Sequence, residues 1–166
     1  MSLMTDEQLQ HAYRYAMSLS NDHASSMDIV HSAYLRLLDQ DVKKINNLLG
    51  YFLRCVRNTF IDQKRLDDRW INTDEDDADS TVDIGLQTLE ALMIEQDLIE
   101  KIWGALKPIE RELLYLWALE GYTIDEISEL TSTSRGTLLS RIHRVRKKIK
   151  LMTNTVNNEV IREYTA

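Results

Sequence analysis

Residues 123–148 read TIDEISELTSTSRGTLLSRIHRVRKK, and this stretch decides the fold because it predicts a helix-turn-helix. Thr123 and Glu126 have the spacing of a capping box, which predicts a short helix that buries Ile124, Ile127 and Leu130. A four-residue turn follows. Ser134 is then the expected N-cap of a second helix.

The second helix has one apolar side and one basic side. The apolar residues recur at every third or fourth position and are Leu138, Ile142, Val145 and Ile149. The opposite side carries Gly136, Ser140, Arg144 and Lys147, with Arg141, Arg146, Lys148 and Lys150 on its shoulders. Such a helix can enter a major groove, with its first turns at base edges and its later cations at phosphates.

A solvated cationic face on any short helical pair would look similar. Confinement of the cations to the second of two capped helices favours DNA binding over that alternative. The helix expected from Pro108 shows the contrasting pattern, because Glu110, Arg111 and Glu112 mix signs as an ordinary solvated face does.

The composition predicts an all-helical, cytoplasmic protein. The 166 residues are 43% hydrophobic and include one proline and five glycines, and no stretch alternates for long. No apolar run approaches the roughly 18 residues that span a bilayer, and the first ten residues carry acids where a signal peptide carries cations. The single cysteine, Cys55, is most simply a small buried side chain.

The net charge of −7 does not exclude a DNA-binding role, because the acidity is concentrated in one segment. Residues 67–100 hold twelve of the 27 acidic residues and one of the 20 basic ones. Residues 67–85 lack apolar periodicity and carry too much like charge to pack, so they predict a flexible acidic linker. At about 3.3 Å per residue the linker could reach roughly 60 Å, so the helical domains on either side need not touch. These domains span residues 1–66 and 86–152, and residues 153–166 form a polar tail that would fray or add a last helix.

The N-terminal domain reads as three helices near residues 5–20, 26–39 and 48–66. The second begins after Ser25 and points Val30, Tyr34, Leu37 and Leu38 inward. The third has an apolar stripe at Leu49, Leu53, Val56 and Phe60 and places Arg54, Asn58 and Arg65 on another face. The Asn58 amide could read a base edge, but an ordinary exposed asparagine would look the same, so the residues alone leave its role open.

The C-terminal domain opens with helical periodicity from Leu86 to Trp103. Pro108 suits the first turn of the next helix, whose Ile109, Leu113, Leu116 and Trp117 would support the helix-turn-helix. The four histidines form no metal-binding spacing, and we expect neither a metal nor a cofactor.

Three segments together resemble the sigma-70 family of bacterial RNA polymerase specificity factors, in its small two-domain extracytoplasmic-function type. The segment from Asp28, DIVHSAYLRLL, is similar to the helix that binds the polymerase clamp, and the segment from Tyr51, YFLRCVRNTFID, is similar to the minus-ten helix. Leu106 to Leu113, Glu120 to Thr123 and the helix from Gly136 are similar to the minus-thirty-five domain.

The resemblance implies a non-enzymatic factor that binds core RNA polymerase at the largest-subunit clamp and the flap, together with duplex and unpaired promoter DNA. An anti-sigma factor is a further partner that it allows. The residues implied for polymerase binding are Asp28, His31, Ser32, Leu35 and Arg36. Those implied for the minus-ten strand are Arg54, Arg57, Asn58, Lys64 and Arg65, with Asn58 where the family reads a flipped base. Those implied for the minus-thirty-five duplex are Arg135, Thr137, Ser140, Arg141, Arg144 and Lys147.

Two departures from the family pattern keep an alternative open. Leu139 stands where the family usually has a cation, and Lys64 and Arg65 are followed by Leu66 and two aspartates instead of further bases. Both fit a sigma-like adaptor that binds polymerase while another partner supplies the DNA targeting. Two other functions fit the sequence less well. A helix-turn-helix repressor would leave the N-terminal domain without a role, and an enzyme would need a constellation of catalytic residues that this sequence does not contain.

Overall fold

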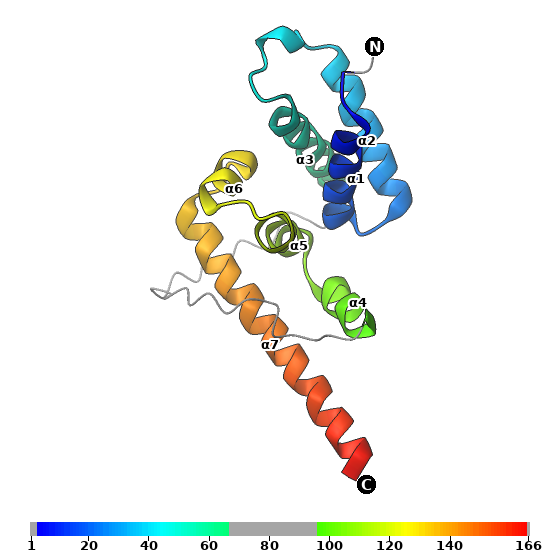
Figure 1. Ribbon diagram of the computed structural model, residues 1–166, viewed down its shortest axis with the longest axis vertical. Coiled ribbons are helices and arrows are strands. Elements are labelled where there is room, and N and C mark those ends of the chain that lie inside the picture. Colours follow the sequence, from blue (N-terminus) through cyan, green and yellow to red (C-terminus); the bar gives the residue numbers. More distant parts are fainter. Residues whose placement is uncertain (1–2, 67–95, 166) are drawn as a thin grey trace.

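The computed structural model describes residues 3–66 and 96–165, and every regular element within these ranges is helical, which confirms the predicted all-helical fold (Figure 1). The N-terminal unit contains α1 (Asp6–Ser20), α2 (His23–Leu38), the short 3-10 helix η1 (Val42–Lys44) and α3 (Leu48–Leu66). The C-terminal unit contains α4 (Gln96–Ala105), α5 (Pro108–Leu114), the π-helical turn η3 (Tyr115–Leu119), α6 (Ile124–Thr131) and α7 (Arg135–Thr165). The predicted acidic linker and the first part of the helix predicted from Leu86 lie outside the described residues.

The three helices of the N-terminal unit pack against one another around a common apolar core. Small side chains on α1 and α2 let the helices approach closely, and aromatic residues of α3 fill the space between them. The core residues are Ala12, Ala16, Ile29, Ala33, Phe52, Val56 and Phe60. Cys55 is half-buried, which raises the pKa of its thiol.

Helix α2 begins earlier than the sequence predicts. The carboxylate of Asp22 accepts a hydrogen bond of 2.8 Å from the amide of Ser25, so Asp22 is the N-cap and the first helical residue is His23. The helix presents Ile29, Ala33 and Leu37 to the core. Leu38 is 50% exposed, so its predicted inward position is wrong.

Helix α5 lies at the centre of the molecule, between α1 and α7 (Figure 1). Pro108 occupies its first turn, as predicted, because proline needs no hydrogen bond from its nitrogen there. The predicted apolar stripe of α7 is also confirmed, since Leu138, Ile142, Val145 and Ile149 are all buried.

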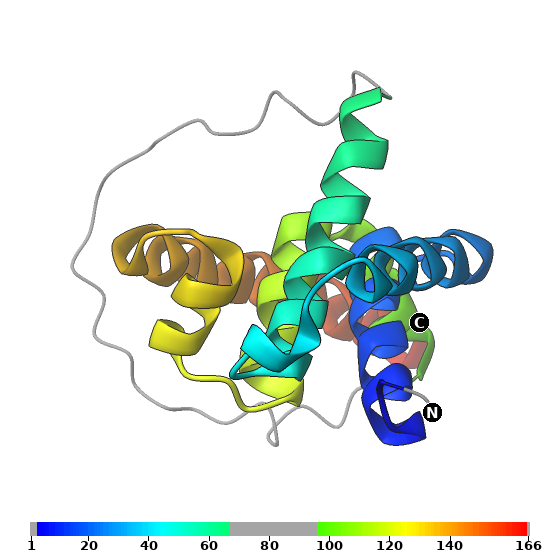
Figure 2. The same ribbon diagram turned by 90° about the horizontal axis from the view of Figure 1, so that it is seen from above.

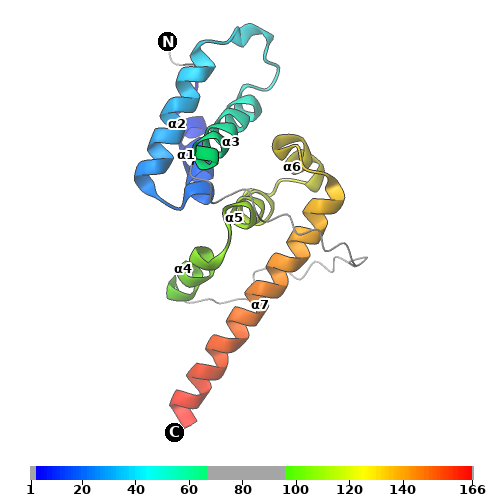
Figure 3. The ribbon, with the colours of Figure 1, turned by 180° about the vertical axis from the view of Figure 1, so that it is seen from behind.

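Helix α7 runs without a break from Arg135 to Thr165. The sequence allowed a frayed tail or a separate last helix after Leu151, whereas the structure continues the same helix. Its C-terminal part extends away from the remaining helices, as the view from behind in Figure 3 makes clear.

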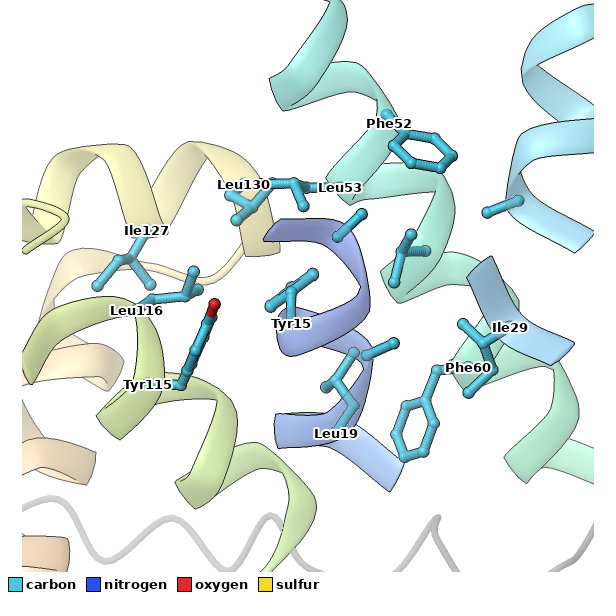
Figure 4. Packing of buried hydrophobic residues seen from close by; sticks show 14 of the residues in the cluster. Tyr15, Leu19, Ile29, Phe52, Leu53, Phe60, Tyr115, Leu116, Ile127 and Leu130 are labelled. Carbon is cyan, nitrogen blue, oxygen red and sulfur yellow. The ribbon is translucent and has the colours of Figure 1, made fainter. Parts of the chain in front are cut away.

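The N-terminal and C-terminal units pack against each other, which the sequence did not require. Helix α1 lies against α5, and α3 lies against α6. Seen from above, α6 and the first turns of α7 lie on one side of α3, while α1 and α2 lie on the other (Figure 2). One apolar cluster joins the units and includes Tyr15 and Leu53 from the first and Leu116 and Leu130 from the second (Figure 4).

Candidate nucleic-acid interface

The turn between α6 and α7 is fixed by local hydrogen bonds that orient the start of α7. Thr123 and Glu126 form the predicted capping box, and the hydrogen bonds from Thr123 hold the pKa of the Glu126 carboxyl below its usual range. Ser132 ends α6 in the left-handed region at a φ of 52°. The hydroxyl of Ser128 then donates to the carbonyl of Thr133, and the hydroxyl of Ser134 accepts from the amide of Thr137 as an N-cap.

The residues predicted to face duplex DNA lie together on the first turns of α7. Arg135, Ser140, Arg144 and Lys147 are exposed, and Thr137 and Arg141 are partly exposed. The guanidinium of Arg135 pairs with Asp125 of α6 at 2.5 Å, which ties it to the first helix of the motif. The partly exposed Leu139 lies beside this basic surface.

The residues predicted to hold the minus-ten strand do not all share one environment on α3. Arg54, Asn58 and Arg65 are exposed and Lys64 is partly exposed. Arg57 points into the junction between the two units instead, where its side chain is only 13% exposed and its Nε donates to Glu112 at 2.9 Å.

The predicted polymerase-binding residues lie together on the outer face of α2. Asp28, His31, Leu35 and Arg36 are exposed, and Ser32 is partly exposed. Leu35 is 50% exposed and Met27 of the same helix is 52% exposed, so apolar and polar groups alternate on this face. Arg36 pairs with Asp62 of α3 at 3.1 Å, an exposed ion pair whose contribution to stability is small.

The junction between the units contains two charged residues whose sequence pattern suggested a solvated face. Arg111 and Glu112 of α5 are instead 6% and 3% exposed. The guanidinium of Arg111 donates to the carbonyls of Ser18 and Leu19 at the end of α1 and to that of Leu106. Apolar residues of the segment from Ile109 to Trp117 are spread around the helix between these charges, a pattern that indicates a largely buried helix but does not identify the partners of the charged residues.

Glu112 accepts hydrogen bonds from both helices that it meets in the N-terminal unit. Its Oε1 lies 2.5 Å from the hydroxyl of Tyr15 and 2.9 Å from Nε of Arg57. Burial, together with the Glu112 carboxylate, raises the pKa of Tyr15 well above its usual value, so the phenol remains a donor. On the rim, Nδ1 of His11 lies 3.3 Å from a carboxylate oxygen of Glu120.

The described residues contain no group of three or more His, Cys, Asp or Glu side chains arranged to hold a metal ion. Nor does any described helix have both the length and the apolar content that crossing a membrane requires.

Comparison with known families identifies both units. Residues 5–70 match the model for sigma-70 region 2, and residues 96–149 match the model for sigma-70 region 4. Among solved structures, the chain is similar to the sigma factor RpoE of Bartonella quintana, crystallised in complex with the anti-sigma factor NepR. The match has a TM-score of 0.65 at 20% identity and covers 89% of this chain and 92% of that chain. With region 2 and region 4 in family order and a shared fold, the chain belongs to the sigma-70 family, in its small extracytoplasmic-function type.

Proposed function

We propose that this sigma factor binds core RNA polymerase and directs it to promoters, with a different helix serving each contact. Helix α2 would dock on the clamp of the largest subunit, α3 would capture the unpaired minus-ten strand, and the first turns of α7 would enter the major groove of the minus-thirty-five duplex. The C-terminal unit would also meet the flap. The reaction is initiation of transcription, and the chain contributes recognition and strand separation.

The observation that carries the proposal is the division of α7 into two faces. Leu138, Ile142 and Val145 are buried against the rest of the C-terminal unit, while Ser140, Arg144 and Lys147 are exposed from the same turns. Polar side chains and cations on a capped, firmly packed helix are suited to base edges and phosphates in a groove. The decisive test is to mix the chain with core RNA polymerase and sequence the transcripts that begin on genomic DNA.

A sigma-like adaptor is the second candidate, favoured by Leu139 and by the position of Arg57. Leu139 adds an apolar group beside the basic surface of α7, and Arg57 is held by Glu112. An adaptor would bind polymerase but require another DNA-binding partner. Promoter opening by polymerase with this chain alone would exclude it.

An anti-sigma factor is a further proposed partner. Support comes from the structural likeness to RpoE of Bartonella quintana, which was crystallised with the anti-sigma factor NepR.

Combined substitution of Asp28→Ala and Arg36→Ala should weaken the complex with core polymerase. Both side chains are exposed on the outer face of α2, and interface contacts of this kind contribute about 1 to 2 kcal/mol, so the affinity should fall roughly tenfold or more. Gel filtration and a fluorescence titration would measure the loss. Asp6→Ala with Lys101→Ala is the matched control, since it removes one exposed acid and one exposed base elsewhere. Absence of co-migration of the unmodified chain with any bacterial core enzyme would refute the sigma assignment of α2.

Arg144→Ala should weaken binding of the full chain to duplex DNA and make that binding less sensitive to salt. Each phosphate contact releases close to one counterion, so the slope of log affinity against log salt should fall by about 0.9. Arg141→Ala should act in the same way. Lys101→Ala, which removes an exposed cation from α4, should leave the slope unchanged. Titrations of a labelled 30-base-pair duplex would measure this, and unchanged slopes for both arginine variants would place the DNA surface elsewhere.

A further inference from the structure

The first residue of α7 is a cation at a place where the helix itself disfavours one. Arg135 begins α7, and the aligned peptide dipoles leave a partial positive charge at this end of a helix. The first turn of α6 follows the favourable rule instead, because it carries the acids Asp125 and Glu126. Helix stability therefore does not account for the presence of Arg135.

The carboxylate of Asp125 orients the guanidinium of Arg135. Nη1 of Arg135 donates to Oδ1 of Asp125 at 2.5 Å, and the two side chains are 60% and 76% exposed, respectively. An ion pair that is this exposed contributes little to the free energy of folding. The contact instead restricts the rotamers of a long side chain, and it leaves the other guanidinium nitrogens available to a ligand.

The position of this acid favours a base, and not a phosphate, as the ligand of Arg135. A phosphate contact depends on positive charge near the backbone, and a neighbouring carboxylate weakens it. Recognition of a base edge needs a guanidinium held in one orientation, so that two N–H groups reach O6 and N7 of guanine together. The pair of Asp125 and Arg135 is suited to the second task.

One helical turn further on, Leu139 adds an apolar group to the same side of α7. Residues four apart on a helix are neighbours on its surface. Leu139 is partly exposed and belongs to neither apolar core of the described residues. Beside it, a Cβ added at Gly136 would meet nothing within 4 Å, so this surface is open to a close approach. In a major groove, the apolar group that such a side chain can contact is the C5 methyl of thymine.

We propose that Asp125, Arg135 and Leu139 form a base-reading set, in which Arg135 reads a guanine, Asp125 orients Arg135 and Leu139 contacts a thymine methyl. Four residues of helix rise about 6 Å, so the two bases lie within about two base pairs of each other. Asp125 is a positioning residue that need not touch DNA. The inference rests on the proposed entry of α7 into the minus-thirty-five duplex, and it makes Leu139 a part of DNA recognition.

Selection from a library of randomised duplexes tests the role of Arg135. The full chain, alone and with core polymerase, should enrich a guanine and a thymine within about two base pairs of each other. Titration of duplexes that carry each of the four base pairs at the guanine position would then measure the preference. Arg135→Ala should reduce that preference roughly fivefold to a hundredfold. Its slope of log affinity against log salt should fall less than that of Arg144→Ala, because no phosphate contact is lost.

Asp125→Ala separates orientation from charge. Removal of the acid should strengthen binding to duplexes of arbitrary sequence, while the preference for guanine should fall severalfold because Arg135 is no longer held. Glu129→Ala is the matched control, since it removes another exposed acid of α6, and it should leave the preference unchanged. In an Arg135→Ala background, Asp125→Ala should have no further effect on the preference.

Replacement of the selected thymine by deoxyuridine tests Leu139. This change deletes only the C5 methyl, so the unmodified chain should bind the altered duplex about threefold to fourfold more weakly. The Leu139→Ala chain should bind both duplexes equally.

The outcomes separate this inference from the function on which it rests. Selection of a site without the guanine, or an Arg135→Ala chain that keeps its base preference and loses as much salt slope as Arg144→Ala, would overturn the proposal and leave α7 as a duplex-binding helix. A guanine preference unchanged in Asp125→Ala would refute the positioning role, and equal binding of thymine and deoxyuridine by the unmodified chain would refute the role of Leu139. If no chain binds any duplex, even with core polymerase, the proposed function of α7 fails and the inference fails with it.

Discussion

Substitution of Asn58 by alanine should reduce promoter opening roughly tenfold to a hundredfold while leaving polymerase binding unchanged. Asn58 is exposed on α3, whereas the residues proposed to bind polymerase belong to α2. Its amide can bond a base edge only after that base has left the duplex, and such contacts contribute about 1 to 3 kcal/mol of discrimination. The loss should therefore appear at strand separation and not at assembly.

Permanganate footprinting on a promoter found by transcript mapping would measure this effect. A template already unpaired at the minus-ten element should recover the melting part of the loss but not the base preference. Gln63→Ala is a suitable control, because Gln63 is exposed on the same helix outside the proposed site. Normal opening of paired DNA by the Asn58→Ala chain would remove this residue from the site.

Leu138→Asp should unfold most of the C-terminal unit and abolish duplex binding. Leu138 is 2% exposed and lies with Leu113 and Ile127 where α5, α6 and α7 meet. An unpaired carboxylate buried at this point costs several kcal/mol, which is comparable with the whole stability of a small domain. Circular dichroism would show the lost helix, and hydrogen exchange would localise it to α5, α6 and the start of α7.

The adjacent residue provides the control for this prediction. Leu139 is partly exposed, so Leu139→Asp places the same charge one position along the helix where water can reach it. That chain should melt cooperatively within about 1 kcal/mol of the unmodified protein. A Leu138→Asp chain that melts equally well would contradict the packing described for α7.

The helix-turn-helix was predictable because its determinants are local. The capping box at Thr123, the N-cap at Ser134 and the apolar spacing from Leu138 to Ile149 act within one or two turns, and all three appear in the structure. The start of α2 was missed for an equally local reason. Ser25 resembles a capping residue, but the carboxylate of Asp22 accepts the Ser25 amide and moves the helix start back to His23.

The junction between the units could not be predicted from local patterns. Arg111 and Glu112 are charged neighbours on a short helix, and adjacent charges usually face water. Their partners, Tyr15, Arg57 and the end of α1, are far away in the sequence: Glu112 is 55 residues from Arg57 and 97 residues from Tyr15. Only the packing of α5 against α1 brings them together.

Local sequence patterns also could not show which residues of the candidate site are accessible. Arg54 and Arg57 are both arginines on α3, one helical turn apart, and the resemblance gave them one role. The structure exposes Arg54 and places Arg57 beside Glu112. Which of two similar cations is available to a ligand depends on tertiary contacts, so the sequence can identify the helix but not the accessible residue.

Because α7 has no break over its 31 residues, it behaves as a single rod about 46 Å long at 1.5 Å per residue. Any tilt of its first turns is carried, magnified by leverage, to its far end beyond Met152. A fluorophore or bead attached near Thr165 would thus act as a pointer for the orientation of the groove-facing turns without touching them. A protein bound to the turns of α7 beyond Met152 would likewise change the orientation of the turns that begin at Arg135, without contacting the basic surface itself.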